Sequence, residues 1–385
     1  MRNVFGILCL ATLALAQTKP RARDLGVHFD GTPGPLNAIT DVAGVEVGHS
    51  TIIRGEGKLD VGKGPVRTGV TVVLPRGKKN LNPVFAAAYS LNGEGEMTGT
   101  LRIEEFGILE TAVFLTNTVS VGTVRDAAIA WRLKQGPPDD EGYSWSVPVV
   151  AETWDGDLND ANGFHVKFEH VAEALNGARS GPVAEGNVGG GTGMDCFGFK
   201  CGIGTASRKL GAKSGGYTVG VLVQANFGSR RNLAIAGVPV GKEIPEPQPL
   251  TGSTQTFDSD SGSILVVVAT DAPLLPHQLK RLLRRVPMGL ARTGSIGGSG
   301  SGDLFLAFST AHASPNTEAE VKQIPTFPLG AMNPLFAATI EATEEAIINA
   351  LVAAETMTGI DNREVIALPH DRLRETLKKY NRLAH

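Results

Sequence analysis

The chain of 385 residues is 42% hydrophobic and carries a formal net charge of −3, so it can bury the core of one large domain or of two medium ones. This near-neutral charge, with a pI of about 6.3, excludes the basic footprint typical of nucleic-acid-binding domains, and we expect no nucleic-acid partner. The sequence shows no internal repeat and no heptad run.

The N-terminal stretch MRNVFGILCLATLALAQ has the pattern of a cleaved secretory signal. Arg2 is followed by an apolar core and then by small residues before Gln17, which is the order of features in signal peptides. The alternative, a transmembrane anchor, would need a longer apolar core. We therefore expect residues 1–16 to be removed and the mature protein to be secreted or periplasmic, without a membrane anchor.

In the first half of the mature chain, strand and helix patterns mix without strict alternation. Short β-rich runs fill residues 38–74, and mixed apolar segments follow over 84–99 and 108–122. Helices are predicted over 124–136 and over 168–178, and between them SVPVVAETWDG (146–156) is typical of a buried strand that runs into a loop.

The second half begins with a glycine-rich segment over 186–210. The later elements are strands over 217–228 and 302–310, an exposed loop over 240–262, and helices over 276–293, 333–359 and 368–384, the second of them long and amphipathic. This mixture favours an α/β (α+β) layered packing over a simple βαβ series.

Two cysteines remain once the signal is removed, Cys196 and Cys201 in DCFGFKC. In an oxidising compartment they could form a disulfide, and two buried thiols are the alternative. A zinc site would need more ligands than this segment offers, and the eight histidines are scattered without ligand spacing. We therefore expect no metal site.

A serine at the mouth of a buried strand is the most unusual feature of the sequence. The polar run FDSDSG ends at Gly262, and Ser263 precedes the apolar run ILVVVA, which is typical of a strand buried on both faces. If the peptide between them were cut, Ser263 would carry a hydroxyl and an α-amine, and such an amine, with a pKa of about 7.7–8.0, can act as a base. A simple turn before a strand is the alternative.

Six ordered segments resemble the L-aminopeptidase/D-esterase and β-peptidyl aminopeptidase family, the DmpA-like self-processing serine aminopeptidases. They are GPLNAITDVAGVEVGH, VVAETWDGDLND, GGGTGM, GVLVQANFG, GSILVVVATDAPLLPHQLKRL and GSGDLFLAFST, and the likeness covers about residues 22–380. It implies a four-layer α-β-β-α sandwich, which resembles the N-terminal nucleophile hydrolases but differs from them in connectivity. It also implies a homo-oligomer, often a tetramer, and no cofactor.

The resemblance implies autocleavage between Gly262 and Ser263, which would give an α chain of residues 17–262 and a β chain of residues 263–385. Ser263 would then be the nucleophile. The sequence does not decide whether the general base is the α-amine of Ser263 or another group of the site.

The other site residues also come from the resemblance. Ser301 and Asp303 would assist the nucleophile, and Asn226 would donate to the oxyanion. Glu152 would bind the substrate's ammonium group, with Trp154 standing where relatives have tyrosine. Without the resemblance, these positions would be interpreted as loop and turn residues.

The sequence therefore predicts a secreted, self-processing serine aminopeptidase that acts on short peptides, amides or esters of L-, D- or β-amino acids. One alternative is an acyltransferase of the ornithine acetyltransferase type, which would use Thr where this chain has Ser263. The other is a non-catalytic periplasmic binding protein, which would need two similar lobes that the sequence does not show.

Overall fold

The computed structural model describes residues 19–136, 145–245, 261–312, 321 and 323–383. The expected signal over residues 1–16 and most of the expected loop over residues 240–262 lie outside these ranges. In the described ranges, no helix is both long enough and apolar enough to cross a membrane.

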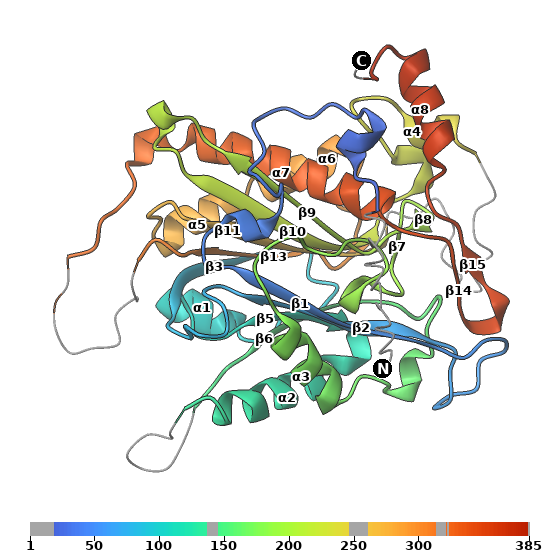
Figure 1. The fold of residues 1–385 in the computed structure, drawn as a ribbon, viewed down its shortest axis with the longest axis horizontal. Coiled ribbons are helices and arrows are strands. Elements are labelled where there is room, and N and C mark those ends of the chain that lie inside the picture. The colour runs from blue at the N-terminus through green and yellow to red at the C-terminus, as the bar shows by residue number, and fades with distance from the viewer. Residues whose placement is uncertain (1–18, 137–144, 246–260, 313–320, 322, 384–385) are drawn as a thin grey trace, which may run out of the picture.

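Two β-sheets lie face to face, and helices cover the outer face of each, which gives four layers (Figure 1). The first sheet has a parallel β5–β6 pair and is otherwise antiparallel; its order is β1 (Glu46–Arg54), β2 (Val66–Leu74), β5 (Val113–Asn117), β6 (Val149–Thr153). The second runs β4 (Ile108–Leu109), β3 (Val84–Ser90), β13 (Leu304–Ser309), β11 (Ser261–Thr270), β10 (Thr218–Phe227), β9 (Ile203–Lys209), with β12 (Gly300–Ser301) beside β11.

Two small hairpins lie outside these sheets. They pair β7 (Asp195–Cys196) with β8 (Phe199–Lys200) and β14 (Met357–Thr358) with β15 (Glu364–Val365).

The helices divide between the two outer layers. On the first sheet lie α2 (Val121–Leu133) and α3 (Phe168–Gly177), and on the second lie α5 (Pro276–Leu283), α6 (Val286–Arg292) and α7 (Asn333–Val352). The remaining α-helices are α1 (Thr100–Phe106), α4 (Val240–Glu243) and α8 (His370–Lys379).

Strand periodicity explains how the second sheet serves two cores at once. Successive side chains of a strand point to opposite faces, so Leu265 and Val267 of β11 pack between the sheets, whereas Val266 and Val268 pack beneath the outer helices. The sequence of a strand that is buried on both faces is a continuous run of apolar residues. Ser263 has the parity of Leu265 and therefore belongs to the face between the sheets.

Two helices differ from the sequence-based expectation. The helix expected over 276–293 is interrupted after Leu283, because Pro287 lacks an N–H group and its ring would clash with the carbonyl four residues earlier. The helix expected over 333–359 ends at Val352 and is buried on most of its surface rather than amphipathic. The N-terminal segment covers its outer side, where Arg23 forms a salt bridge with Glu345 at 2.7 Å.

Two local boundaries differ as well. The expected loop over residues 240–262 begins with the short helix α4, whose Val240 is buried. Strand β11 begins at Ser261, two residues before the expected start, because Ser261 and Gly262 pair with β12.

Candidate active site

Ser263 lies at one end of the second sheet, where β10, β11 and β12 meet. It is 6% exposed and pairs in register with Asn226 of β10, while Gly262 pairs with Ser301 of β12. Opposed residues of antiparallel strands have Cβ atoms about 5 Å apart. The sheet therefore brings together three segments that are far apart in sequence.

A single backbone amide holds both the carbonyl of Gly262 and the hydroxyl of Ser263. The N–H group of Gly302 donates to the Gly262 oxygen at 2.9 Å and to Ser263 Oγ at 3.2 Å. Gly262 has a φ of +110°, and a Cβ at this position would lie 2.0 Å from the backbone oxygen of Asn226. Only glycine fits this backbone conformation and this space.

A hydroxyl–carboxylate pair lies at the end of β12, beside Gly262, with Ser301 on the strand and Asp303 two residues later. Ser301 Oγ donates to Asp303 Oδ1 at 2.6 Å, and both residues are buried. Asn92 Nδ2 donates to the second carboxylate oxygen, Asp303 Oδ2, at 3.3 Å. Because the Ser301 proton is directed to Asp303, the lone pairs of the Ser301 oxygen remain as acceptors.

The side chain of Asn226 has a fixed orientation. Its Oδ1 atom accepts a hydrogen bond of 3.0 Å from the backbone N–H group of Asp195, and the residue is 6% exposed. When the oxygen of an amide is held in this way, its two N–H donors are presented on the other side. Asn226 is thus a neutral donor beside its register partner Ser263.

Glu152, near the end of β6, has a buried carboxylate that accepts hydrogen bonds from two other groups. Its Oε1 atom accepts from the N–H group of Glu96 at 3.0 Å, and its Oε2 atom accepts from the hydroxyl of Thr118. Burial raises the pKa of Glu152, and the bonds from Thr118 and Glu96 oppose that rise. The two donors therefore favour the ionised form in a site that would otherwise disfavour it.

The carboxylate of Glu152 lies close to the Ser263 site. A Cβ built on Gly95 would lie 3.0 Å from Glu152 Oε1 and 3.4 Å from the Cα of Gly302, and one on Gly302 would lie 2.9 Å from Ser263 Oγ. Segment 94–96 thus borders both groups, with Gly95 lying between Glu152 and Gly302.

The other expected site residues lie further out. The ring of Trp154 is 43% exposed and lies over Gly156, where a Cβ would be 2.1 Å from the indole. Cys196 and Cys201 form a disulfide with an S–S length of 2.02 Å. It reaches the site through Asp195, the residue before Cys196.

Sequence reasoning missed the side chains of Thr118 and Asn92 and the backbone amides of Glu96, Asp195 and Gly302. The signal for Thr118 was the polar run TNT at the end of a strand. Strands β5 and β6 are parallel and pair Thr116 with Glu152, so their carboxyl ends meet at one edge. The amides of Glu96 and Gly302 carry no side-chain signal, because any residue except proline offers a backbone N–H group.

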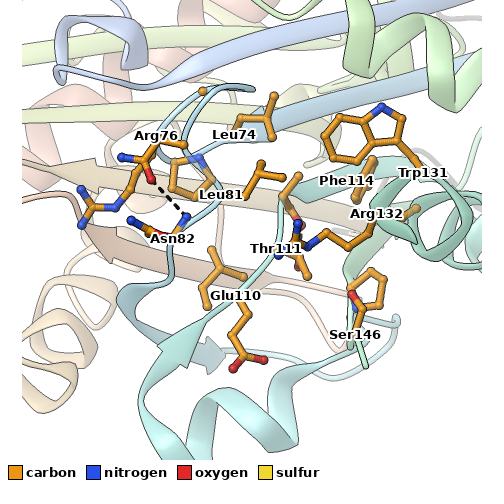
Figure 2. A pocket seen from close by; sticks show the side chains of 17 residues that line it. Leu74, Arg76, Leu81, Asn82, Glu110, Thr111, Phe114, Trp131, Arg132 and Ser146 are labelled. Atoms are coloured by element: carbon orange, nitrogen blue, oxygen red, sulfur yellow. Dashed lines mark hydrogen bonds between the residues drawn. The ribbon is translucent and has the colours of Figure 1, made fainter. Parts of the chain in front are cut away.

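A separate cavity lies at the end of the first sheet, beside α2 (Figure 2). Leu74, Phe114 and Trp131 form its apolar wall, and Arg132 is one of its polar lining residues. None of the residues around Ser263 lines it, so it is distinct from the candidate active site. In the described ranges, no group of three His, Cys, Asp or Glu side chains is arranged to hold a metal ion.

Comparisons with known proteins agree on one family. The model of peptidase family S58 matches residues 37–365. A β-peptidyl aminopeptidase, BapA, of Sphingosinicella microcystinivorans is 55% identical over 95% of this chain and 93% of its own length. The BapA of Sphingosinicella xenopeptidilytica is 49% identical over 96% of this chain and 93% of its own.

Solved structures of similar proteins share the fold. The L-aminopeptidase D-Ala-esterase/amidase of Ochrobactrum anthropi superposes with a TM-score of 0.87 at 46% identity, over 95% of this chain and all of its own. That enzyme is described as a prototype for the serine aminopeptidases and a new variant of the Ntn hydrolase fold. A β-aminopeptidase of a Burkholderia species has a TM-score of 0.85 at 46% identity, over 94% of this chain and 99% of its own. The expected fold class is confirmed.

Proposed function

The chain belongs to peptidase family S58 and is an aminopeptidase, and from this premise we propose that it cuts itself between Gly262 and Ser263 and then uses Ser263 as its nucleophile. One observation carries the proposal. The Gly302 amide donates to the Gly262 carbonyl oxygen and to Ser263 Oγ at once, so the electrophile and the neighbouring hydroxyl are held at the same point. These are the parts of an intramolecular acyl shift.

Self-cleavage proceeds in two balanced steps. Ser263 Oγ attacks the Gly262 carbonyl carbon and loses its proton, the C–N bond breaks, and the Ser263 nitrogen takes up a proton, which leaves an ester. Water then hydrolyses the ester and gives the Gly262 carboxyl group and a free Ser263 with its hydroxyl restored. Before the cut the Ser263 nitrogen is an amide and not a base. The Ser301 oxygen therefore takes the first proton while its own proton passes to Asp303 Oδ1, to which it is bonded at 2.6 Å, and the reverse transfer delivers a proton to the leaving Ser263 nitrogen.

Turnover of substrate uses the same serine after maturation. The freed α-amine of Ser263 has an ordinary pKa of about 7.7–8.0 and acts as the base for its own hydroxyl. The side-chain amide of Asn226 donates to the oxyanion, since its own oxygen is occupied by the Asp195 amide. The acyl-enzyme is an ester that water hydrolyses to release the N-terminal residue of the substrate.

Glu152 binds the free ammonium group of the substrate and makes the enzyme an aminopeptidase. Its carboxylate is buried, is held by Thr118 and Glu96, and borders the Ser263 site across Gly95. A charge-assisted hydrogen bond to such a carboxylate orients a small substrate that offers few other contacts. Because two relatives at 55% and 49% identity are β-peptidyl aminopeptidases, the substrates are peptides or amides with an N-terminal β-amino acid.

Secretion and assembly complete the proposal. Residues 1–16 act as a cleaved signal, which fits the disulfide between Cys196 and Cys201 because disulfides persist in oxidising compartments. The mature enzyme is a periplasmic or secreted homo-oligomer of two-chain protomers. The aminopeptidase relatives leave no support for a binding protein or for an acetyltransferase with a threonine nucleophile.

Intact mass and activity of one preparation test self-cleavage. The wild-type protein should give two chains, 17–262 and 263–385, and Ser263→Ala should stay as one inactive chain, because the attacking hydroxyl is gone. The neighbouring Ser261→Ala keeps that hydroxyl and should still mature. Full cleavage of Ser263→Ala would mean that another protease makes the cut.

Substrate class is tested with paired chromogenic amides. The proposal expects a higher kcat/KM for β-alanyl p-nitroanilide than for L-alanyl p-nitroanilide, and little hydrolysis of either after N-acetylation. A clear preference for the L-alanyl compound would keep the aminopeptidase and overturn the β-amino acid assignment.

A further inference from the structure

The hairpin over residues 194–201 joins the candidate active site to the disulfide. Its strands β7 and β8 share two register pairs, Asp195 with Lys200 and Cys196 with Phe199. Two pairs are too few to hold a hairpin in water on their own. Yet the N–H group of Asp195, in the first pair, is the group that holds Asn226 Oδ1 at 3.0 Å.

Several contacts between residues of the hairpin hold its two strands together. The disulfide between Cys196 and Cys201 spans a Cα–Cα distance of 5.5 Å. The ammonium group of Lys200 is fully buried and donates to the carbonyl oxygens of Met194 and, at 2.9 Å, Cys201. The hydrogen bond from Lys200 to Met194 and the disulfide at Cys196 therefore hold the residues on either side of Asp195.

The turn of the hairpin is anchored to the end of β10. Phe197 and Gly198 both have positive φ, 52° and 67°, as the tight turns of hairpins require. The N–H group of Phe197 donates to the backbone oxygen of Phe227 at 2.9 Å, and the two rings meet at 5.1 Å. Arg230 donates to the turn carbonyl of Phe197 at 2.8 Å. Phe227 directly follows Asn226, so the hairpin contacts β10 at Asn226 itself and at the next residue.

We propose that this hairpin, closed by the Cys196–Cys201 disulfide, is a positioning element that orients the side-chain amide of Asn226 toward the reacting carbonyl. The inference rests on the proposed function. Asp195 and the two cysteines touch no substrate and act through Asn226. Electrostatic stabilisation of an oxyanion depends on donors that are oriented before the charge develops. A loosened hairpin would let the side-chain amide of Asn226 rotate. The enzyme would then stabilise the transition state less well, while its affinity for the substrate would stay the same.

The first experiment replaces the disulfide and separates kcat from KM. The double variant Cys196→Ala/Cys201→Ala should mature into two chains and lower kcat about tenfold, part of the 10²–10³ expected for complete loss of an oxyanion donor, with KM changed less than about twofold. Values are taken per mole of processed protein, so slower self-cleavage does not enter kcat. Val171→Ala, a buried truncation in α3 on the outer face of the other sheet, is the matched control for lost stability and should keep kcat.

The second experiment repeats the replacement in the Asn226→Ala background. If the disulfide acts through Asn226, its removal there should change kcat less than about twofold, because residues that act as one unit are not additive. An equal loss of kcat in both backgrounds would overturn the proposal. So would a double cysteine variant with wild-type kcat.

Reduction of the folded wild type gives a measurement that does not depend on the variant's folding. Under a phosphine reductant, kcat should fall in step with the appearance of two thiols per protomer, while KM holds. Thiols that appear without loss of kcat contradict the inference. A wild type that matures but cleaves no unblocked amide overturns the proposed function itself, so the two failures are distinguishable.

Discussion

At the scale of single residues, two uncharged hydrogen-bond donors hold the buried carboxylate of Glu152 in the candidate site. Glu152 is 4% exposed, and burial alone would favour its neutral form. The Thr118 hydroxyl and the Glu96 amide oppose that effect, although the pKa of Glu152 stays raised. Its charge and its hydrogen bonds can therefore be tested separately.

The charge of Glu152 should govern hydrolysis but not maturation. Glu152→Gln keeps the shape of the side chain, and we expect kcat/KM on an unblocked aminoacyl p-nitroanilide to fall ten- to a hundredfold, since charged hydrogen bonds contribute about 1.5–3 kcal/mol. Self-cleavage presents no free amine and should be unchanged. Glu96→Gln is the matched control, because it removes a neighbouring negative charge that raises the pKa of Glu152 but keeps the backbone N–H group that donates to Glu152, so it should not lower kcat/KM. Equal hydrolysis by Glu152→Gln and the wild type would remove Glu152 from the site.

The hydrogen bond from Thr118 should set the acidic limb of the pH profile. Thr118 lowers the pKa of Glu152 against the effect of burial, so Thr118→Val should raise that pKa further. The carboxylate then ionises at higher pH, and the acidic limb of kcat/KM should shift upward relative to the wild type. Thr118→Ser keeps a hydroxyl and should restore the wild-type limb. A limb that does not move in Thr118→Val would contradict this role.

At the scale of elements, the paired strands β10, β11 and β12 form the site before any cut is made. Gly262 is already a strand residue, paired with Phe227 on one side and with Ser301 on the other. The backbone in front of Ser263 is therefore held rather than loose, with a φ that favours glycine.

Replacing Gly262 should block maturation through geometry alone. In Gly262→Ala, the new Cβ would lie 2.0 Å from the Asn226 backbone oxygen, so the strand must shift and the carbonyl leaves the Gly302 amide. We expect self-cleavage to slow at least tenfold in a time course on denaturing gels, as small misplacements of reacting groups can cost that much or more. Gly237→Ala is the control, because Gly237 also has positive φ but a Cβ there meets no atom within 4 Å. Normal maturation of Gly262→Ala would show that this backbone conformation is not needed.

At the scale of the whole molecule, the proposed cut falls near the start of β11 and leaves the rest of the second sheet and all of the first sheet paired. From Ser263 onward, β11 begins the second chain and lies in the middle of the second sheet, between β10 of the first chain and β13 of the second, whereas Ser261 and Gly262 remain with the first chain. Its side chains contribute to the cores on both of its faces. Cleavage therefore removes one peptide bond and little buried surface.

The two mature chains should consequently remain one folded unit. After maturation they should co-elute in native size-exclusion chromatography and separate only under denaturing conditions. The uncut Ser263→Ala protein is the reference and should melt within a few degrees of the mature protein, since both share the same buried apolar area. Dissociation of the two chains without denaturant would contradict this.

Much of the architecture could be predicted from the sequence because it depends on local pattern. The apolar run after Ser263 and the runs over 217–228 and 302–310 marked the central strands, and all three are buried strands in the structure. The same pattern failed where long-range packing decides. Helix α7 was expected to be amphipathic but is buried on most of its surface, because the N-terminal segment covers its outer side.

The sequence by itself determined the family and the layered fold, and it suggested several side chains of the candidate site but not Thr118, because six ordered segments and strand periodicity depend on residue types. Only the tertiary structure decided which backbone amides serve the site. The Gly302, Glu96 and Asp195 N–H groups hold Ser263, Glu152 and Asn226 respectively. Every residue but proline has such a group, and its direction is set by the register of strands far apart in sequence. Position in the fold, rather than residue type, therefore makes these amides specific.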